Sequence, residues 1–261
     1  MPERSAYAPE LPQKLEAEFS GFTPDQQEAV EETIESTGFP TDNVNLVDYK
    51  EAKRGEEDIL GTFELYYGKL SLYKSLEKLP LIAQGGTVAH EMAHSVSPLN
   101  DKNDRLFGGR EQREAARDHV AAIAGQSIAT RTYLNGYQAH LHRQLEADEI
   151  DESRFVEETF AIMVELRFTN PEHLKEVEKA QIAALKEINK GNKERPAIMP
   201  VALMTGGEAQ RGSVSGIDRT ISNLIPALKT KEDIDAHVAN FRRKLLERGK
   251  PMLPNQVTKA A

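Results

Sequence analysis

Residues 79–97 constrain the fold more than any other segment, because they are apolar enough to require burial and long enough to form a helix. Val88, Met92 and Val96 recur four residues apart, which is the spacing of one face of an α-helix. Pro98 ends the pattern, since proline cannot continue a helix. The segment therefore predicts an apolar helix.

This predicted helix contains the pentad His90-Glu91-Met92-Ala93-His94, an HExxH pattern. Residues four apart share one helix face, so both imidazoles can reach a single metal ion. Glu91 projects beside the open side of such an ion, where it can accept a proton from water. Two histidines without partners among small and apolar neighbours would cost desolvation free energy for no gain. The pattern therefore predicts zinc bound by His90 and His94, with Glu91 as general base.

The chain contains no cysteine, so histidine and carboxylate side chains would have to hold any metal ion. A catalytic zinc takes three protein ligands and leaves a fourth position for water. The glycine and the third histidine of the long metzincin motif do not follow His94. The third ligand is therefore expected to be an acid on a later helix.

Two glutamates compete for this role. Glu114, within residues 113–118, lies in a stretch that resembles the third-ligand segment of thermolysin-type peptidases. Glu158, within residues 157–172, lies in a stretch that resembles the third-ligand helix of the Mlc titration factor A peptidases and of the lethal-factor-like metallopeptidases. The positions shared with this second pattern are Glu158, Phe160, Ala161, Glu165, Phe168, Pro171 and Glu172.

The second resemblance covers more positions and extends over roughly residues 59–172, since this group also places a hairpin ahead of the HExxH helix. It implies a zinc metallopeptidase of the gluzincin type, with one zinc ion per chain on His90, His94 and Glu158. The apolar neighbours of Glu158 favour the same choice, because a carboxylate without a partner costs more there than in a charged helix. Glu114 is the alternative third ligand.

Two further side chains have candidate roles in such a site. Glu165 is predicted either to accept a hydrogen bond from the outer nitrogen of a zinc-binding histidine or to belong to the surface. In the resembled families a tyrosine just upstream of the ligand glutamate donates to the developing oxyanion, but residues 151–157 contain no tyrosine. Tyr137 is the candidate in its place, and packing in the core is its alternative role.

The whole pattern predicts an α+β fold, with a small β part first and a helical part second. The expected elements are a tail or loosely docked arm at residues 1–20, a helix at 24–36, a strand at 45–49, a hairpin at 59–73, and helices at 79–97, 110–125, 130–147, 153–169, 171–189 and 231–247. No internal repeat appears.

The resemblance implies a zincin-like metallopeptidase domain over residues 1–190. Residues 191–261 are then expected to form a C-terminal loop and helical extension packed on the same domain. Peptidases of this group hold the peptide as an added β-strand beside the hairpin. We expect residues 70–73 (Leu70 to Tyr73) to provide that edge.

Composition excludes several classes of partner. The net charge of −9 argues against a nucleic-acid-binding protein, which normally carries an excess of basic residues. No apolar run reaches the length of about 18 residues that a membrane span needs. The N-terminal segment lacks the apolar stretch of a secretory signal, so a cytoplasmic protein is expected, although export without a signal peptide is compatible with the sequence.

The sequence thus predicts a zinc metallopeptidase that hydrolyses a peptide or protein substrate. Glu91 would assist the attack of a zinc-bound water on the peptide bond. The missing tyrosine motivates an alternative, a catalytically weak or inactive metallopeptidase-fold protein that acts as a partner-binding regulatory module. Replacement of Glu91 by glutamine separates the two functions, because it removes the base and no ligand.

Overall fold

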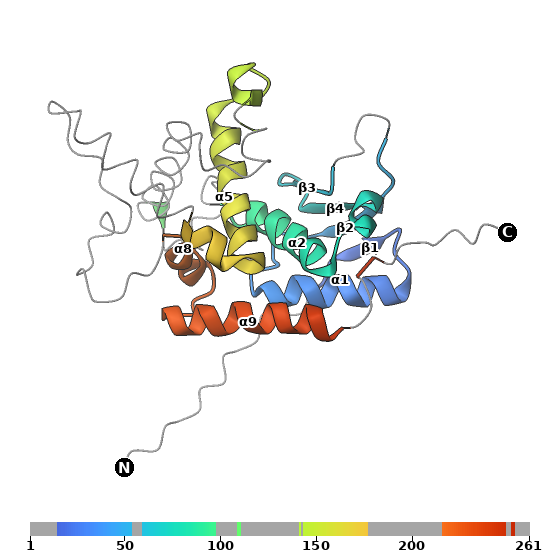
Figure 1. Cartoon of the computed structure of the whole chain (residues 1–261). Coiled ribbons are helices and arrows are strands. Elements are labelled where there is room, and N and C mark those ends of the chain that lie inside the picture. The colour runs from blue at the N-terminus through green and yellow to red at the C-terminus, as the bar shows by residue number, and fades with distance from the viewer. Residues whose placement is uncertain are drawn as a thin grey trace, which may run out of the picture.

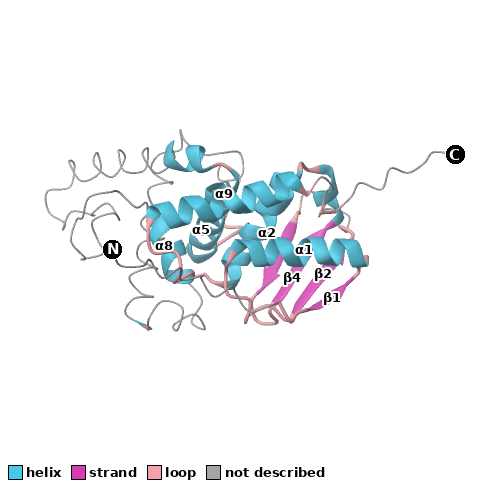
Figure 2. Cartoon of the chain, turned by 90° about the horizontal axis from the view of Figure 1, so that it is seen from below, coloured by secondary structure: helices cyan, strands magenta, loops and turns pink. Residues whose placement is uncertain are grey.

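The computed structural model describes residues 15–53, 59–97, 109–110, 141, 143–176, 216–248 and 252–253. In these ranges the chain has the expected α+β composition, with a small sheet and a larger set of helices (Figure 1). Figure 2 shows helix α1 (Pro24–Thr37) crossing in front of the strands. No helix in the described ranges is long and apolar enough to cross a membrane.

The sheet contains four strands among the described residues, in the order β1-β2-β4-β3. The strands are β1 (Glu18–Ser20), β2 (Leu46–Lys50), β3 (Gly61–Glu64) and β4 (Lys69–Tyr73). β1 pairs with β2 and β2 with β4 in parallel, whereas β3 and β4 form an antiparallel hairpin. The hairpin and the strand at 45–49 are thus confirmed. Residues 1–20 were expected to form a tail or a loosely docked arm, and within them Glu18–Ser20 form strand β1 of the sheet.

One prediction about this sheet was wrong. Residues 70–73 belong to β4, which is paired with β2 on one side and with β3 on the other, so they are not an edge. Within the hairpin, β3 is the strand that lies at the edge of the sheet. The error arose because the order of strands depends on which distant segment pairs with the hairpin, and the pattern within 59–73 does not contain that information.

The described helices are α1 (Pro24–Thr37), the short 3₁₀ helix η1 (Lys74–Lys78), α2 (Leu81–Ser95), α5 (Glu152–Thr169), α8 (Gly216–Leu224) and α9 (Lys231–Glu247). The beginning and end of α1 follow from local chemistry. Thr23 accepts a hydrogen bond from the backbone N–H of Gln26, and Gly38 ends the helix in the left-handed conformation with φ +73°. The helices predicted at 110–125, 130–147 and 171–189 lie largely outside the described residues.

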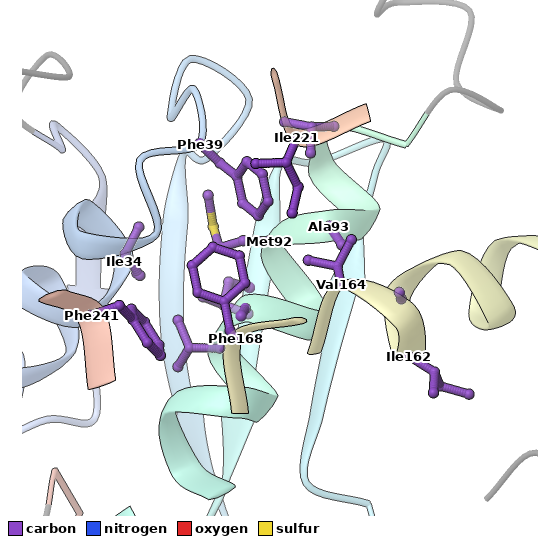
Figure 3. Packing of buried hydrophobic residues seen from close by; sticks show 14 of the residues in the cluster. Ile34, Phe39, Met92, Ala93, Ile162, Val164, Phe168, Ile221 and Phe241 are labelled. Atoms are coloured by element: carbon purple, nitrogen blue, oxygen red, sulfur yellow. The ribbon is translucent and has the colours of Figure 1, made fainter. Parts of the chain in front are cut away.

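The core is shared by α1, the sheet, α2, α5 and α9 (Figure 3). Met92 of α2 is fully buried, and so is Phe168 of α5. The ring of Phe168 lies 4.9 Å from that of Phe241 on α9 and 5.9 Å from that of Phe39, which follows α1. Aromatic side chains from three separate parts of the chain thus meet at one point.

The described part of the C-terminal region packs on this same core. His237 of α9 contacts the backbone oxygen of Thr37 at 2.8 Å, and Arg248 donates to the backbone oxygen of Ala29 at the same distance. Figure 1 shows α9 lying along α1. Residues 191–215 of the predicted extension lie outside the described residues.

Candidate metal site

The site is built on two helices that pack closely, α2 and α5. Gly86 makes this approach possible, because a Cβ atom at this position would lie only 2.5 Å from Thr169 Cγ2 on α5. On the same helix, a Cβ atom at Gly85 would overlap Leu245 of α9. The paired glycines bring α5 and α9 against the turn of α2 that precedes His90.

Three side chains from these two helices converge in the core. Glu158 Oε2 lies 3.3 Å from His90 Nε2 and 3.6 Å from His94 Nε2. All three residues are buried, and Glu158 is only 4% exposed. One nitrogen or oxygen from each lies within 4.8 Å of the others, which is a spacing that could hold a metal ion. Among the described residues, this is the one group of histidines and acids with such geometry.

Each histidine also contacts a second carboxylate through its other ring nitrogen. His90 Nδ1 lies 3.2 Å from Glu165 Oε2, and His94 Nδ1 lies 3.3 Å from Glu157 Oε1. A carboxylate in this position orients the imidazole and strengthens it as a ligand. Glu165 thus makes the contact with an outer histidine nitrogen that one of its two predicted roles requires, while its side chain is 36% exposed. Glu157 was not predicted from the sequence, although its place next to Glu158 on a helix facing two histidines is a signal that could have identified it.

A positively charged arginine side chain lies against the outer side of this group of histidines and glutamates. Arg154, one turn before Glu158, contacts Glu158 Oε1 with its Nη2 atom, and its Nη1 atom lies 3.8 Å from Glu157 Oε2. Its side chain is 53% exposed, in contrast to the buried ligands. The start of α5 is held by Asp151, which accepts a hydrogen bond of 2.8 Å from the backbone N–H of Arg154. Sequence analysis gave Arg154 no role.

These contacts determine the protonation of the group. Burial alone would lower the pKa of His90, but hydrogen bonds to Glu158 and Glu165 outweigh it and raise the pKa to about 10. For His94 burial is likewise outweighed by hydrogen bonds to Glu157 and Glu158, so its pKa is also raised. Burial would raise the pKa of Glu158, but the two histidines hold it well below its usual range. The carboxylate is therefore ionised and available as a ligand at neutral pH.

Glu91 is buried beside this group, between α2 and the edge strand. A Cβ atom at Gly61 of β3 would lie 2.8 Å from Glu91 Cγ and 2.9 Å from Glu91 Oε1, so glycine leaves room for the carboxyl group. Burial raises the pKa of Glu91, while His90 and His94 oppose this effect. Glu91 is thus a carboxyl group with a stronger affinity for protons than usual, placed next to a possible metal.

The structure brings together His90, Glu91, His94 and Glu158 as the sequence analysis expected. Glu114 and Tyr137 lie outside the described residues. Compared with known family models, curated proteins and solved structures, the chain shows no match.

Proposed function

We propose that the chain is a zinc-dependent peptidase that binds one zinc ion through His90, His94 and Glu158. The observation that carries this proposal is the buried group of two histidines and one glutamate with a buried, proton-binding Glu91 beside it. The resemblance of residues 59–172 to gluzincin metallopeptidases supports the same function. A purely structural role would not require two buried imidazoles and two buried acids, Glu91 and Glu158, to lie together with Glu157 and Glu165 at their edge.

The donor set favours zinc over other metals. Two imidazole nitrogens and one carboxylate oxygen match the ligands of catalytic zinc sites, which keep a fourth position open. Calcium and magnesium prefer six or more oxygen ligands, and the group has too few. The carboxylates at the outer nitrogens of His90 and His94 are also typical of zinc-bound histidines.

In the proposed reaction Glu91 moves the protons. Zinc, when bound, supplies Lewis-acid chemistry that polarises a carbonyl oxygen and lowers the pKa of water. Glu91 accepts a proton from the water molecule whose oxygen adds to the carbonyl carbon, and it returns this proton to the nitrogen as the C–N bond breaks. One water is consumed, a carboxylic acid and an amine are released, and Glu91 ends in its original state. Its raised pKa suits both the uptake and the return of the proton.

The edge strand β3 is the position proposed for the substrate. β3 pairs with β4 on one side only among the described residues, and at Gly61 it passes directly beside Glu91. An extended peptide added to this edge would place a peptide bond near the base. This assignment replaces the one predicted for residues 70–73.

The function is tested with wild-type protein and the Glu91→Gln variant. Zinc per chain is measured by elemental analysis, and cleavage is measured by mass spectrometry on a mixture of peptides from a digested proteome. We expect about one zinc per chain in both proteins and a cleavage rate at least about a hundredfold lower in the variant, because only the base is lost.

Three outcomes decide the proposal. Cleavage that disappears with Glu91→Gln while zinc stays bound supports it. A protein that binds zinc but cleaves nothing favours the partner-binding alternative. Absence of zinc from wild-type protein after incubation with the metal would overturn both the peptidase and its metal site.

A further inference from the structure

The two oxygens of the Glu158 carboxylate face different partners. Oε2 lies within 3.6 Å of both histidines, where it would bind a metal ion. Oε1 contacts Arg154, whose side chain extends from the first turn of α5 and is half exposed. The guanidinium is thus joined to a proposed metal ligand on one side and reaches solvent on the other. A ligand that reaches Glu158 from this side would meet this cation.

Arginine retains donors after these contacts. A guanidinium has five N–H groups in one plane, and the contacts with Glu157 and Glu158 involve only Nη1 and Nη2. Arginine side chains in proteins carry a positive charge. The guanidinium can therefore still donate to an oxygen that binds near Glu158.

We propose that Arg154 is a catalytic residue that donates to the carbonyl oxygen of the scissile peptide bond and stabilises its negative charge as water adds. This inference rests on the proposed peptidase function. It fills a chemical requirement that residues 151–157 do not meet with a tyrosine. A positive guanidinium adds charge neutralisation to hydrogen bonding, which makes it a strong partner for a developing oxyanion.

The experiment uses an anion in place of the developing oxyanion. Wild-type protein is loaded with Co²⁺, whose visible absorption reports ligands at the metal, and is titrated with inorganic phosphate and separately with imidazole. Phosphate carries negative charge on its oxygens, whereas imidazole is neutral. For Arg154→Ala we expect about tenfold weaker phosphate binding and unchanged imidazole binding, because only the anion needs the guanidinium. Arg154→Lys should recover part of the phosphate affinity, since it keeps the charge without the planar fork.

Arg243→Ala is the matched control. Arg243 forms an ion pair with Glu247 at 2.6 Å on α9, with the same four-residue spacing and similar exposure, but it lies outside the candidate site. Its replacement should change neither titration. With peptide substrate, Arg154→Ala should lower kcat by about 10²–10³ while zinc content stays at the wild-type level.

The possible failures can be distinguished. Phosphate affinity unchanged by Arg154→Ala overturns the role of Arg154, even if Glu91→Gln abolishes cleavage and the peptidase function stands. Equal weakening of phosphate and imidazole also overturns it, since Arg154 would then only hold Glu158 in place. If wild-type protein cleaves no peptide but binds phosphate in an Arg154-dependent way, the peptidase function and the catalytic role of Arg154 both fail, and only an anion site remains. If no metal binds, both proposals are overturned.

Discussion

His90 touches a carboxylate with each of its two ring nitrogens. Nε2 lies 3.3 Å from Glu158 and Nδ1 lies 3.2 Å from Glu165. These contacts favour the protonated imidazole and raise its pKa to about 10, even though burial acts in the opposite direction. Zinc binds only the neutral ring, so protons and zinc compete for the same nitrogen. The carboxylates that strengthen the imidazole as a ligand also make its proton harder to remove.

The competition predicts an unusual pH dependence of zinc binding. Zinc affinity should keep rising from about pH 7.5 to pH 9, because the folded pKa of His90 lies at about 10. Histidines with the ordinary pKa of about 6.5 would already be neutral, and affinity would level off above about pH 7.5. Competition with a chromogenic chelator at a series of pH values measures this. A plateau above pH 7.5 would contradict the raised pKa.

When a chelator keeps the protein free of metal, the same pKa shifts make its free energy of unfolding depend on pH. The pKa of His90 is raised from 6.5, so its contribution to the free energy of unfolding is complete below about pH 6.5 and is lost as the pH rises towards 10. The pKa of Glu158 is lowered from 4.5, so its contribution is present above about pH 4.5 and is lost as the pH falls. His90 and Glu158 together therefore stabilise the fold most between about pH 4.5 and pH 6.5.

At the scale of helices, the separation of α2 and α5 decides whether the ligands meet. Gly86 lies one turn before His90, and a Cβ atom there would reach Thr169 Cγ2 at 2.5 Å and Glu165 Cγ at 3.4 Å. A side chain at this position therefore requires either a change in the Thr169 side chain or a movement of α5 away from α2. Because Glu158 and Glu165 are both on α5, a movement of α5 would shift the proposed metal ligand and the partner of His90 together.

Gly86→Ala is therefore expected to weaken zinc binding about 10–100-fold, the cost typical of a lost contact behind a metal ligand. The extra methyl should also lower the free energy of unfolding, since overpacking costs about 1–3 kcal/mol and the gain in helix propensity is only about 1 kcal/mol. Chelator competition and urea unfolding measure the two effects.

The control for Gly86→Ala removes the Thr169 atom that the new methyl group would contact. Thr169→Ser deletes Cγ2 but keeps the hydroxyl that donates to the backbone oxygen of Glu165 at 2.8 Å. The double variant of Gly86→Ala with Thr169→Ser should regain zinc affinity close to that of the wild type. If the double variant binds zinc as weakly as Gly86→Ala alone, steric contact with Thr169 is not what sets the helix separation.

At the scale of the whole molecule, one buried arginine joins three helices. Arg167 of α5 contacts Asp218 of α8 and lies 2.6 Å from Asp235 of α9. Arg167 and Asp218 are both about 4% exposed, while the side chain of Asp235 is nearly half exposed. The C-terminal helices are thus connected to the helix that carries Glu158 through charge as well as through the aromatic core.

Arg167→Met should lower the free energy of unfolding by about 3–5 kcal/mol, because it removes the cation from the buried Asp218 and leaves the carboxylate in the core. Asp235→Asn, at the exposed end of the same network, should cost no more than about 1 kcal/mol. Urea unfolding of both variants measures the difference. Equal losses would show that burial of Asp218 does not control the effect.

Much of the site could be predicted from the sequence because its geometry is local. His90 and His94 share a face on any α-helix, whatever the fold, and Glu91 necessarily lies beside them. The beginning and end of α1 could also be predicted from nearby residues, because Thr23 caps the start of this helix and Gly38 ends it. The choice of Glu158 rested on a resemblance, and the structure places this residue against both histidines.

Other features depend on contacts between distant segments. The sequence alone determined an apolar helix with two histidines on one face and a glutamate beside them, and an α+β order of elements, because each follows from helical or strand periodicity. Only the tertiary structure decided that β3 is the edge, that Glu157 supports His94 and that Arg154 contacts Glu158. Strand order and the rotation of α5 against α2 are set by the packing of the whole core, which short stretches of sequence do not encode.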